Sequence, residues 1–140
     1  MSTRKKTSSL DALIVGAGFG GIYMLYKLRS IGLSAKIIDV ASGVGGTWFW
    51  NRYPGARCDV ESMFYSYSFD KGLEQEWEWT ERYPAQPEIL KYINHVADRF
   101  DLWPDILLKT RVISAVYCET DATWLIATDG DGDFSAQFCI

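Results

Sequence analysis

Closely spaced glycines after the first apolar run have the arrangement that binds the pyrophosphate of a dinucleotide. Residues 16–21 read Gly16-Ala-Gly18-Phe19-Gly20-Gly21, which is the GxGxxG pattern. The first glycine of this pattern allows a tight turn, the second leaves room for the phosphates, and the third lets a helix pack closely on a sheet. Free N–H groups at the start of that helix then face the phosphates. The loop therefore predicts a dinucleotide site built from Gly16, Gly18, Phe19, Gly20 and Gly21.

The segments around these glycines are those that a dinucleotide loop requires. Residues 11–15 form an apolar run suited to a buried strand, and residues 19–30 carry an apolar stripe typical of a helix that ends at Gly32. Residues 35–39 predict a second strand, which completes a βαβ unit. Asp39, at the end of that strand, is placed to accept hydrogen bonds from a ribose, and its carboxylate would disfavour a 2'-phosphate. The unit therefore favours FAD or NAD over NADP in this site.

A GxGxxG pattern alone is weak evidence, because glycines often simply mark turns. Here the strand, the helix and the acidic strand end all agree with it, and this context favours nucleotide binding. Gly45 and Gly46 follow Asp39 after five further residues. This extended pattern resembles that of flavoproteins with two dinucleotide-binding domains, and the resemblance favours FAD over NAD.

Aromatic residues are concentrated just after this unit, between Trp48 and Tyr83. A hydrophobic core segment would explain some of them. It would not explain the polar residues set among them, which include Asn51, Arg52, Arg57, Asp59 and Glu61. Apolar faces with a few fixed polar groups are what a planar ring ligand needs. The segment therefore predicts the part of the site that covers the ring of the cofactor.

At these residues the chain resembles the Baeyer-Villiger monooxygenases, a family of class B flavoprotein monooxygenases. The resemblance rests on GGTW at residues 45–48, NRYPG at 51–55 and CDVES at 58–62, and it continues through WEWTERY at 77–83 and QPEIL at 86–90. It implies an enzyme that binds FAD, takes hydride from NADPH and captures O2 as a flavin peroxide. The peroxide would add to a ketone substrate and insert oxygen beside the carbonyl, which gives an ester or lactone.

The resemblance also implies roles for individual residues. The GxGxxG glycines would line the pyrophosphate of FAD with Asp39 on the ribose, and a backbone group of Val112 would meet the adenine. The flavin end would be lined by Gly46, Thr47, Trp48, Arg57, Asp59 and Tyr65. Asp59 would act in catalysis by supporting an active-site arginine, because a carboxylate fixes the position of a guanidinium charge. The alternative interpretation of Asp59 is a structural ion pair or a turn cap.

Length and composition bound the remaining possibilities. The chain has 140 residues and a net charge of -4, which predicts one domain and no general attraction to nucleic acid or an anionic membrane. No apolar run is long enough for a membrane span, and the N-terminus lacks the apolar stretch of a signal peptide, so we expect a cytoplasmic protein. Three widely spaced cysteines predict neither a disulfide framework nor a zinc site. We expect residues 1–10 to be a flexible tail and residues 11–140 to be the FAD-binding domain.

The second half of the chain predicts one helix and three short strands. The helix covers residues 87–100, and the strands cover residues 111–118, 123–128 and 134–140. The Asp/Gly turn at residues 129–133 lacks the glycine and glutamate of a calcium loop, so no metal is expected there. His95, the only histidine, is expected at the boundary of the helix and not in catalysis. The predicted fold class is α/β, a Rossmann-like FAD-binding domain with a small antiparallel β-meander.

The chain departs from the family pattern in its length. The second GxGxxG for NADPH, the FxGxxxHxxxW fingerprint and the active-site arginine are not found in it. The sequence therefore predicts the N-terminal part of a flavoprotein with two dinucleotide-binding domains. We expect this part to be inactive alone and its partner to be the remainder of the enzyme. Two alternatives stay open: another FAD enzyme, such as a nitrogen- or sulfur-oxygenating monooxygenase or a reductase, and a non-catalytic FAD-binding module.

Overall fold

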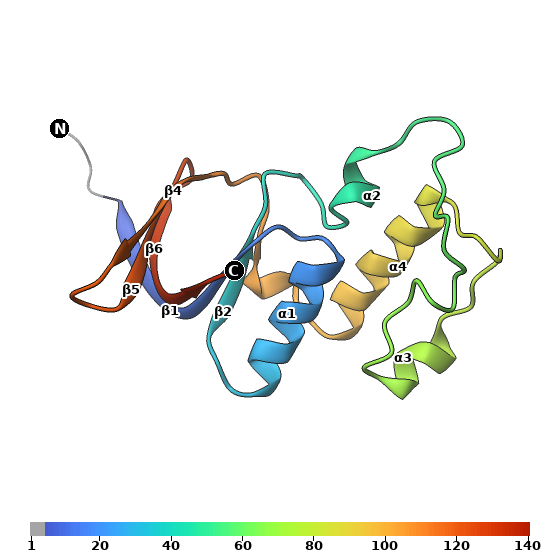
Figure 1. Ribbon diagram of the computed structural model, residues 1–140, viewed down its shortest axis with the longest axis horizontal. Helices are drawn as coiled ribbons and strands as arrows, with labels where there is room; N and C mark the ends of the chain where they lie inside the picture. The colour runs from blue at the N-terminus through green and yellow to red at the C-terminus, as the bar shows by residue number, and fades with distance from the viewer. Residues whose placement is uncertain (1–4) are drawn as a thin grey trace.

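The computed structural model describes residues 5–140 and shows an α/β fold with one six-stranded sheet (Figure 1). The strands lie in the order β3-β2-β1-β6-β5-β4. β1 (Lys6–Val15) pairs in parallel with β2 (Ala35–Ile38) and with β6 (Gly132–Cys139), and β2 pairs in parallel with β3 (Ile106–Leu107). The Rossmann-like fold class predicted from the sequence is confirmed.

β1 begins earlier than the sequence predicts. The expected flexible tail covers residues 1–10, of which residues 1–4, including Arg4, lie outside the described part of the chain. Lys6 to Leu10 pair with residues 132–136 of β6, so the tail prediction is wrong for these residues. The physical reason is that β6 satisfies the backbone hydrogen bonds of this polar segment. A pairing between two distant segments leaves no trace in the local sequence pattern.

The β-meander is formed by β4 (Val112–Cys118), β5 (Thr123–Thr128) and β6, which pair in antiparallel fashion. The strand over residues 123–128 has the predicted bounds, and the other two differ from the prediction by one or two residues. At the Asp/Gly turn, the Asp129 carboxylate accepts from Arg111 N at 2.7 Å and that of Asp133 accepts from Thr128 N at 2.9 Å. These carboxylates therefore fix the ends of the hairpin.

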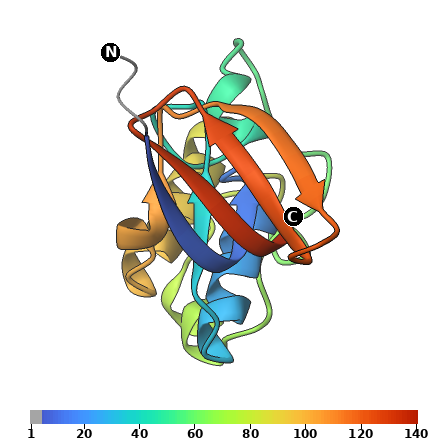
Figure 2. The same ribbon diagram turned by 90° about the vertical axis from the view of Figure 1, so that its left-hand side faces the viewer.

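Helices and meander lie on opposite faces of the parallel strands. Figure 1 shows the meander to the left and the helices to the right, and Figure 2 shows the meander in front with the helices behind it. The larger core lies under the helices and includes Ile14, Ile22 and Leu25. A smaller core joins Leu13 and Ile38 to the meander residues Ile126, Phe134 and Ala136. The central strands are thus buried on both sides, as expected for a parallel sheet.

The two longer helices lie where the sequence predicts them. α1 (Phe19–Ser30) has the predicted bounds, and α4 (Gln86–Arg99) is displaced from its prediction by one residue. Gly32 ends the segment after α1 with φ +84°, a conformation that favours glycine. None of the described helices is both long and apolar enough to cross a membrane.

Short elements between residues 47 and 107 were not predicted. They are α2 (Thr47–Trp50), α3 (Lys71–Glu76), the 3-10 helix η1 (Trp103–Asp105) and β3. Each has too few residues to show a hydrophobic period. α3 is recognisable afterwards by its cap, because the Asp70 carboxylate accepts from Leu73 N at 2.7 Å.

Candidate functional site

The GxGxxG loop connects β1 to α1, and the structure gives different reasons for its glycines. Gly16 has φ +109°, which only glycine adopts readily. A Cβ on Gly21 would overlap the carbonyl oxygen of Gly16, so a side chain there would push the helix away from the loop. Around Gly18, the nearest atom to an added Cβ would be Gly46 Cα at 3.6 Å, an ordinary contact. The protein itself leaves the space at Gly18 open, which suits the close approach of a phosphate.

The start of α1 is suited to an anion. Gly18 is its N-cap residue and provides no side-chain hydrogen bond, and the first turn contains no acidic residue. The first N–H groups of a helix have no partners within the helix, and the helix dipole favours negative charge at this end. The loop and helix therefore fit a pyrophosphate, as the sequence predicts.

Gly45 and Gly46 lie directly against this loop. Gly45 N donates to Ala17 O at 2.8 Å. An added Cβ on Gly46 would lie 3.0 Å from Gly18 Cα, and both Gly45 and Gly46 have positive φ. The extended glycine pattern therefore has a physical basis, because only glycines let these two backbones approach so closely.

Asp39 follows β2, and its carboxylate fixes the loop. One oxygen, Oδ2, accepts from Ala17 N at 2.7 Å, and Oδ1 accepts from Ala41 N at 2.8 Å. A carboxylate has about four lone-pair sites, so each oxygen can still accept a hydrogen bond from a ribose hydroxyl. The ribose role stays a prediction. The sequence did not reveal the loop-fixing role, because the choice of N–H partner depends on the folded loop.

A cavity of about 120 Å³ opens beside Asp39. Three residues predicted for the site, Gly16, Asp39 and Val112, line it together. Sequence reasoning missed its other lining residues, which are Val15, Ile38, Val40 and Thr110. Val15 and Val40 are exposed although they are apolar. Apolar side chains around one carboxylate suit a flat base attached to a ribose.

Aromatic residues form the other end of the site. The indole Nε1 of Trp48 donates to Tyr65 Oη at 2.9 Å, and the Tyr65 ring lies 5.2 Å from that of Phe19. The structure thus brings three predicted residues from separate segments together. Thr47 precedes Trp48 and is the first residue of α2. The carbonyl oxygen of Trp48 accepts from the side chain of the buried Gln86 at 2.5 Å.

Tyr67 is a contributor that sequence reasoning missed. Its hydroxyl donates to Phe19 O at 2.5 Å, in the first turn of α1. Burial, with smaller effects of Tyr92 and Tyr65, raises the pKa of Tyr67, so its hydroxyl stays protonated and remains a donor. The only signal in the sequence is its spacing of two residues from Tyr65.

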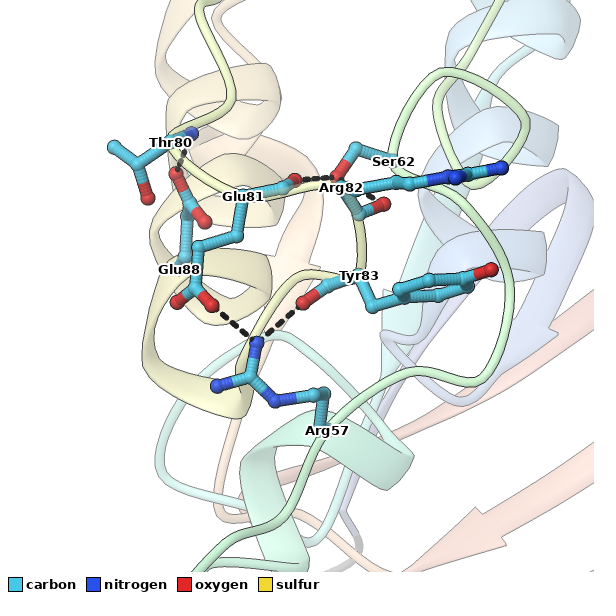
Figure 3. Close-up of polar contacts among 7 residues, drawn as sticks. All are labelled: Arg57, Ser62, Thr80, Glu81, Arg82, Tyr83 and Glu88. Atoms are coloured by element: carbon cyan, nitrogen blue, oxygen red, sulfur yellow. Dashed lines mark hydrogen bonds and ion pairs between the residues drawn. The ribbon is translucent and has the colours of Figure 1, made fainter.

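Arg57 and Asp59 lie in the segment between residues 51 and 62, which is attached to residues 80–83 (Figure 3). Arg57 Nη1 donates to Glu81 Oε2 at 2.7 Å and to Tyr83 O at 2.5 Å. Asp59 is exposed, and its carboxylate forms no hydrogen bond within residues 5–140. The structure therefore does not join either residue to Trp48 or to the glycine loop, and their cofactor and catalytic roles stay predictions.

Both buried and exposed contacts hold the segment of residues 51–62 against residues 80–83. Ser62 is buried and its hydroxyl donates to the carbonyl oxygens of Glu81 and Arg82. Arg82 forms an ion pair with Glu61, and Thr80 N donates to Glu88 Oε1 at 2.8 Å. Figure 3 shows the contacts of Ser62 with residues 81 and 82 and that of Thr80 with Glu88. The polar residues set among the aromatics are thus partly structural.

The loop, the adjacent helix terminus and the cavity at the strand ends define a Rossmann-like dinucleotide-binding domain. The family model for NAD(P)-binding Rossmann-like domains matches residues 14–75. The chain is 50% identical over 135 residues to acetone monooxygenase (methyl acetate-forming) of Gordonia sp. (strain TY-5), covering 96% of this chain and 25% of that protein. It is also 50% identical over 131 residues to phenazine N-monooxygenase PhzNO1 of Lysobacter antibioticus, covering 93% of this chain and 24% of the relative.

Solved structures agree with these relatives. An oxidized steroid monooxygenase bound to NADP is 56% identical, with a TM-score of 0.92, over 94% of this chain and 25% of that chain. The open crystal structure of cyclohexanone monooxygenase is 46% identical, with a TM-score of 0.92, over 95% of this chain and 26% of that chain. The chain is also 46% identical over 140 residues to a Baeyer-Villiger monooxygenase of Pseudooceanicola batsensis, covering 99% of this chain and 26% of that protein, so nearly all of it is similar to one part of flavin-dependent monooxygenases. It spans about a quarter of the length of the curated relatives that it matches.

Proposed function

We propose that this chain forms the FAD-binding part of an NADPH- and O2-dependent monooxygenase that inserts oxygen beside a ketone carbonyl. The observation that carries the proposal is the open space at Gly18, between the free N–H groups of α1 and Gly46. Acetone and cyclohexanone monooxygenases among the relatives support a ketone substrate. We assign the oxygen insertion to a polypeptide of the relatives' length that contains this chain. We also propose a cytoplasmic location.

The residues of this chain would bind and orient the cofactor. Gly16, Gly18, Gly20 and Gly21 would hold its pyrophosphate, and Asp39 and Val112 would hold its adenosine half. Residues at the aromatic end would position the ring system, namely Phe19, Gly46, Thr47, Trp48, Arg57, Asp59 and Tyr65. When bound, FAD would supply the redox chemistry between NADPH and oxygen. NADPH would bind mostly to residues outside this chain.

Asp59 is the residue for which we propose a catalytic role. It is exposed and not committed to a described hydrogen bond, so its carboxylate is available to a cation from outside the described residues. A paired carboxylate would hold an arginine in the position that stabilises developing negative charge. Arg57 does not pair with Asp59 in the observed arrangement, since its Nη1 donates to Glu81 and to the Tyr83 carbonyl.

A second candidate function is oxygenation of an aromatic nitrogen. It is favoured by the 50% identity to phenazine N-monooxygenase PhzNO1, which equals the identity to the acetone enzyme. Both candidates need the same FAD site. Product analysis with a ketone and with a phenazine, on a protein of the relatives' length that contains this chain, would separate them.

Titration of the purified chain with FAD, NAD and NADP tests the site. We expect FAD to bind most tightly, because Asp39 disfavours a 2'-phosphate and the Gly45-Gly46 pair extends the site. Gly18→Val should abolish FAD binding, because a branched side chain would occupy the space that the pyrophosphate needs. A melting temperature measured without nucleotide serves as the control for folding. Tighter binding of NADP than of FAD would contradict the proposal.

A further inference from the structure

A second hollow on the molecule shares no residue with the glycine loop or with the cavity at Asp39. Its volume is about 310 Å³. That size is at the lower end of the range for small-molecule sites. Its walls combine aromatic rings with one flexible apolar side chain and one acid, namely Tyr67, Trp77, Trp79, Tyr92, Met63 and Glu74. None of the lining residues is a lysine or arginine.

The rings form adjoining walls and not a stack. Trp77 lies at 72° to Trp79 and at 63° to Tyr92, with centroids 5.6 Å and 5.3 Å apart. Trp79 and Tyr92 are inclined at 46°, with centroids 4.9 Å apart. Hydrogen bonds hold one wall in place, since Trp79 Nε1 donates to Ser66 Oγ at 2.8 Å. Inclined aromatic faces around one space are the arrangement that binds organic ammonium ions.

The one charged residue that lines the hollow, Glu74, also favours a cation. Glu74 is exposed, and it takes part in none of the ion pairs found within residues 5–140. Its neighbour Glu76, in contrast, is paired with Arg99. Burial raises the pKa of Tyr92, the hydrogen bond from Tyr67 N lowers it, and the charge of Glu74 raises it. A carboxylate without a partner beside aromatic faces attracts a cation.

Two polar hydrogens at the hollow have no acceptor in the described part of the chain. The Nε1 of Trp77 is buried without a hydrogen-bond partner. The Tyr92 hydroxyl, on a side chain only 1% exposed, accepts from Tyr67 N at 2.9 Å but donates to no described group. Buried donors without partners are costly. Trp77 Nε1 is itself fully buried, so the Tyr92 hydroxyl is the donor that a ligand oxygen would satisfy.

We propose that this hollow binds a small organic ammonium ion that carries a hydroxyl group. The ammonium group lies against the faces of Trp77 and Trp79 with Glu74 as its counter-ion, and the hydroxyl oxygen accepts from Tyr92. The hollow shares Tyr67 with the aromatic end of the nucleotide site but none of the residues around the glycine loop or Asp39. Its ammonium-binding groups, Trp77, Trp79 and Glu74, have no role in the proposed FAD-binding function, so the two proposals can be tested separately.

Calorimetric titration of the full chain with choline tests this site. The control ligand is 3,3-dimethylbutan-1-ol, which has the same shape and hydroxyl group but no charge. We expect saturable binding of choline and at least about tenfold weaker binding of the neutral alcohol, the scale of a cation–π contact. Quenching of tryptophan fluorescence should follow the same isotherm, because Trp77 and Trp79 line the hollow.

Glu74→Gln and Glu78→Gln form a matched pair of variants. Both residues are exposed and both changes remove one negative charge, but only Glu74 lines the hollow. We expect Glu74→Gln to weaken choline binding about three- to tenfold and Glu78→Gln to leave it unchanged. Equal effects of the two variants, equal affinity for the neutral alcohol, or no choline binding by the folded wild-type chain would overturn the proposal. FAD titration of the same samples reports on the nucleotide site independently.

Discussion

Replacing Asp39 with alanine should destabilise the chain even when no nucleotide is present. The Asp39 carboxylate accepts from Ala17 N at 2.7 Å and from Ala41 N at 2.8 Å. Hydrogen bonds to a charged group contribute about 1.5–3 kcal/mol each. Because Asp39 is only half-buried, we reduce this to about 1–2 kcal/mol each. The free energy of unfolding should therefore fall by about 2–4 kcal/mol, and Tm by about 8–15 °C.

Asp39→Asn provides a finer test. The amide oxygen can still accept one of the two bonds, but its NH2 group would face the second backbone N–H as another donor. Ala17 is fully buried, so its N–H could not turn to water. We therefore expect the asparagine variant to lose about 1–3 kcal/mol.

Thermal unfolding followed by circular dichroism measures both variants without added nucleotide. Asp59→Ala is the control, because the Asp59 side chain is exposed and forms no hydrogen bond within residues 5–140. Its Tm should equal that of the wild-type chain. If the Tm of Asp39→Ala also lay within about 2 °C of the wild-type Tm, the carboxylate would not stabilise the loop. Its role would then be limited to hydrogen bonding with the ribose.

Three further predictions concern catalysis and pH. In a protein of the relatives' length, Asp59→Ala should keep its FAD content but slow oxygen insertion by roughly one to three orders of magnitude; unchanged turnover per flavin would exclude the catalytic role. The 140-residue chain with FAD and NADPH should give no lactone from cyclohexanone by gas chromatography, and lactone formation would refute this. Hydrogen bonds from the side chain and backbone of Ser34 lower the pKa of Asp11 below 3.8. This stabilisation is complete above the unfolded pKa and is lost as pH falls through the folded pKa. Asp11→Asn should therefore show a shallower loss of Tm below about pH 4, and parallel curves would contradict the assignment.

The sequence predicted the elements whose pattern is local and long. The helix over Phe19–Ser30 and the strand over Thr123–Thr128 have their predicted bounds, because periodicity and turn residues mark them. It also predicted that Gly16, Asp39 and Val112 belong to one site, and they line one cavity.

Other features depend on contacts that only the folded chain creates. The pairing of residues 6–10 with β6 joins segments far apart in the sequence. The hydrogen bond of Tyr67 to Phe19 O and that of Gln86 to Trp48 O likewise connect distant segments. The ion pair between Arg57 and Glu81 is likewise a contact between separate segments, and the sequence alone does not show that the two side chains meet. A single sequence shows the residue types but not these partners.

The position of β6 has a consequence for how the chain acquires its fold. β1 is a central strand, yet one of its two neighbours, β6, comes almost the whole chain later. Contacts between such distant segments require closure of a long loop and slow the folding of a domain. During synthesis, the strand that leads into the glycine loop leaves the ribosome well before its second neighbour exists. We therefore expect its exposed edge to need protection from pairing with other chains until residues 132–139 have been made.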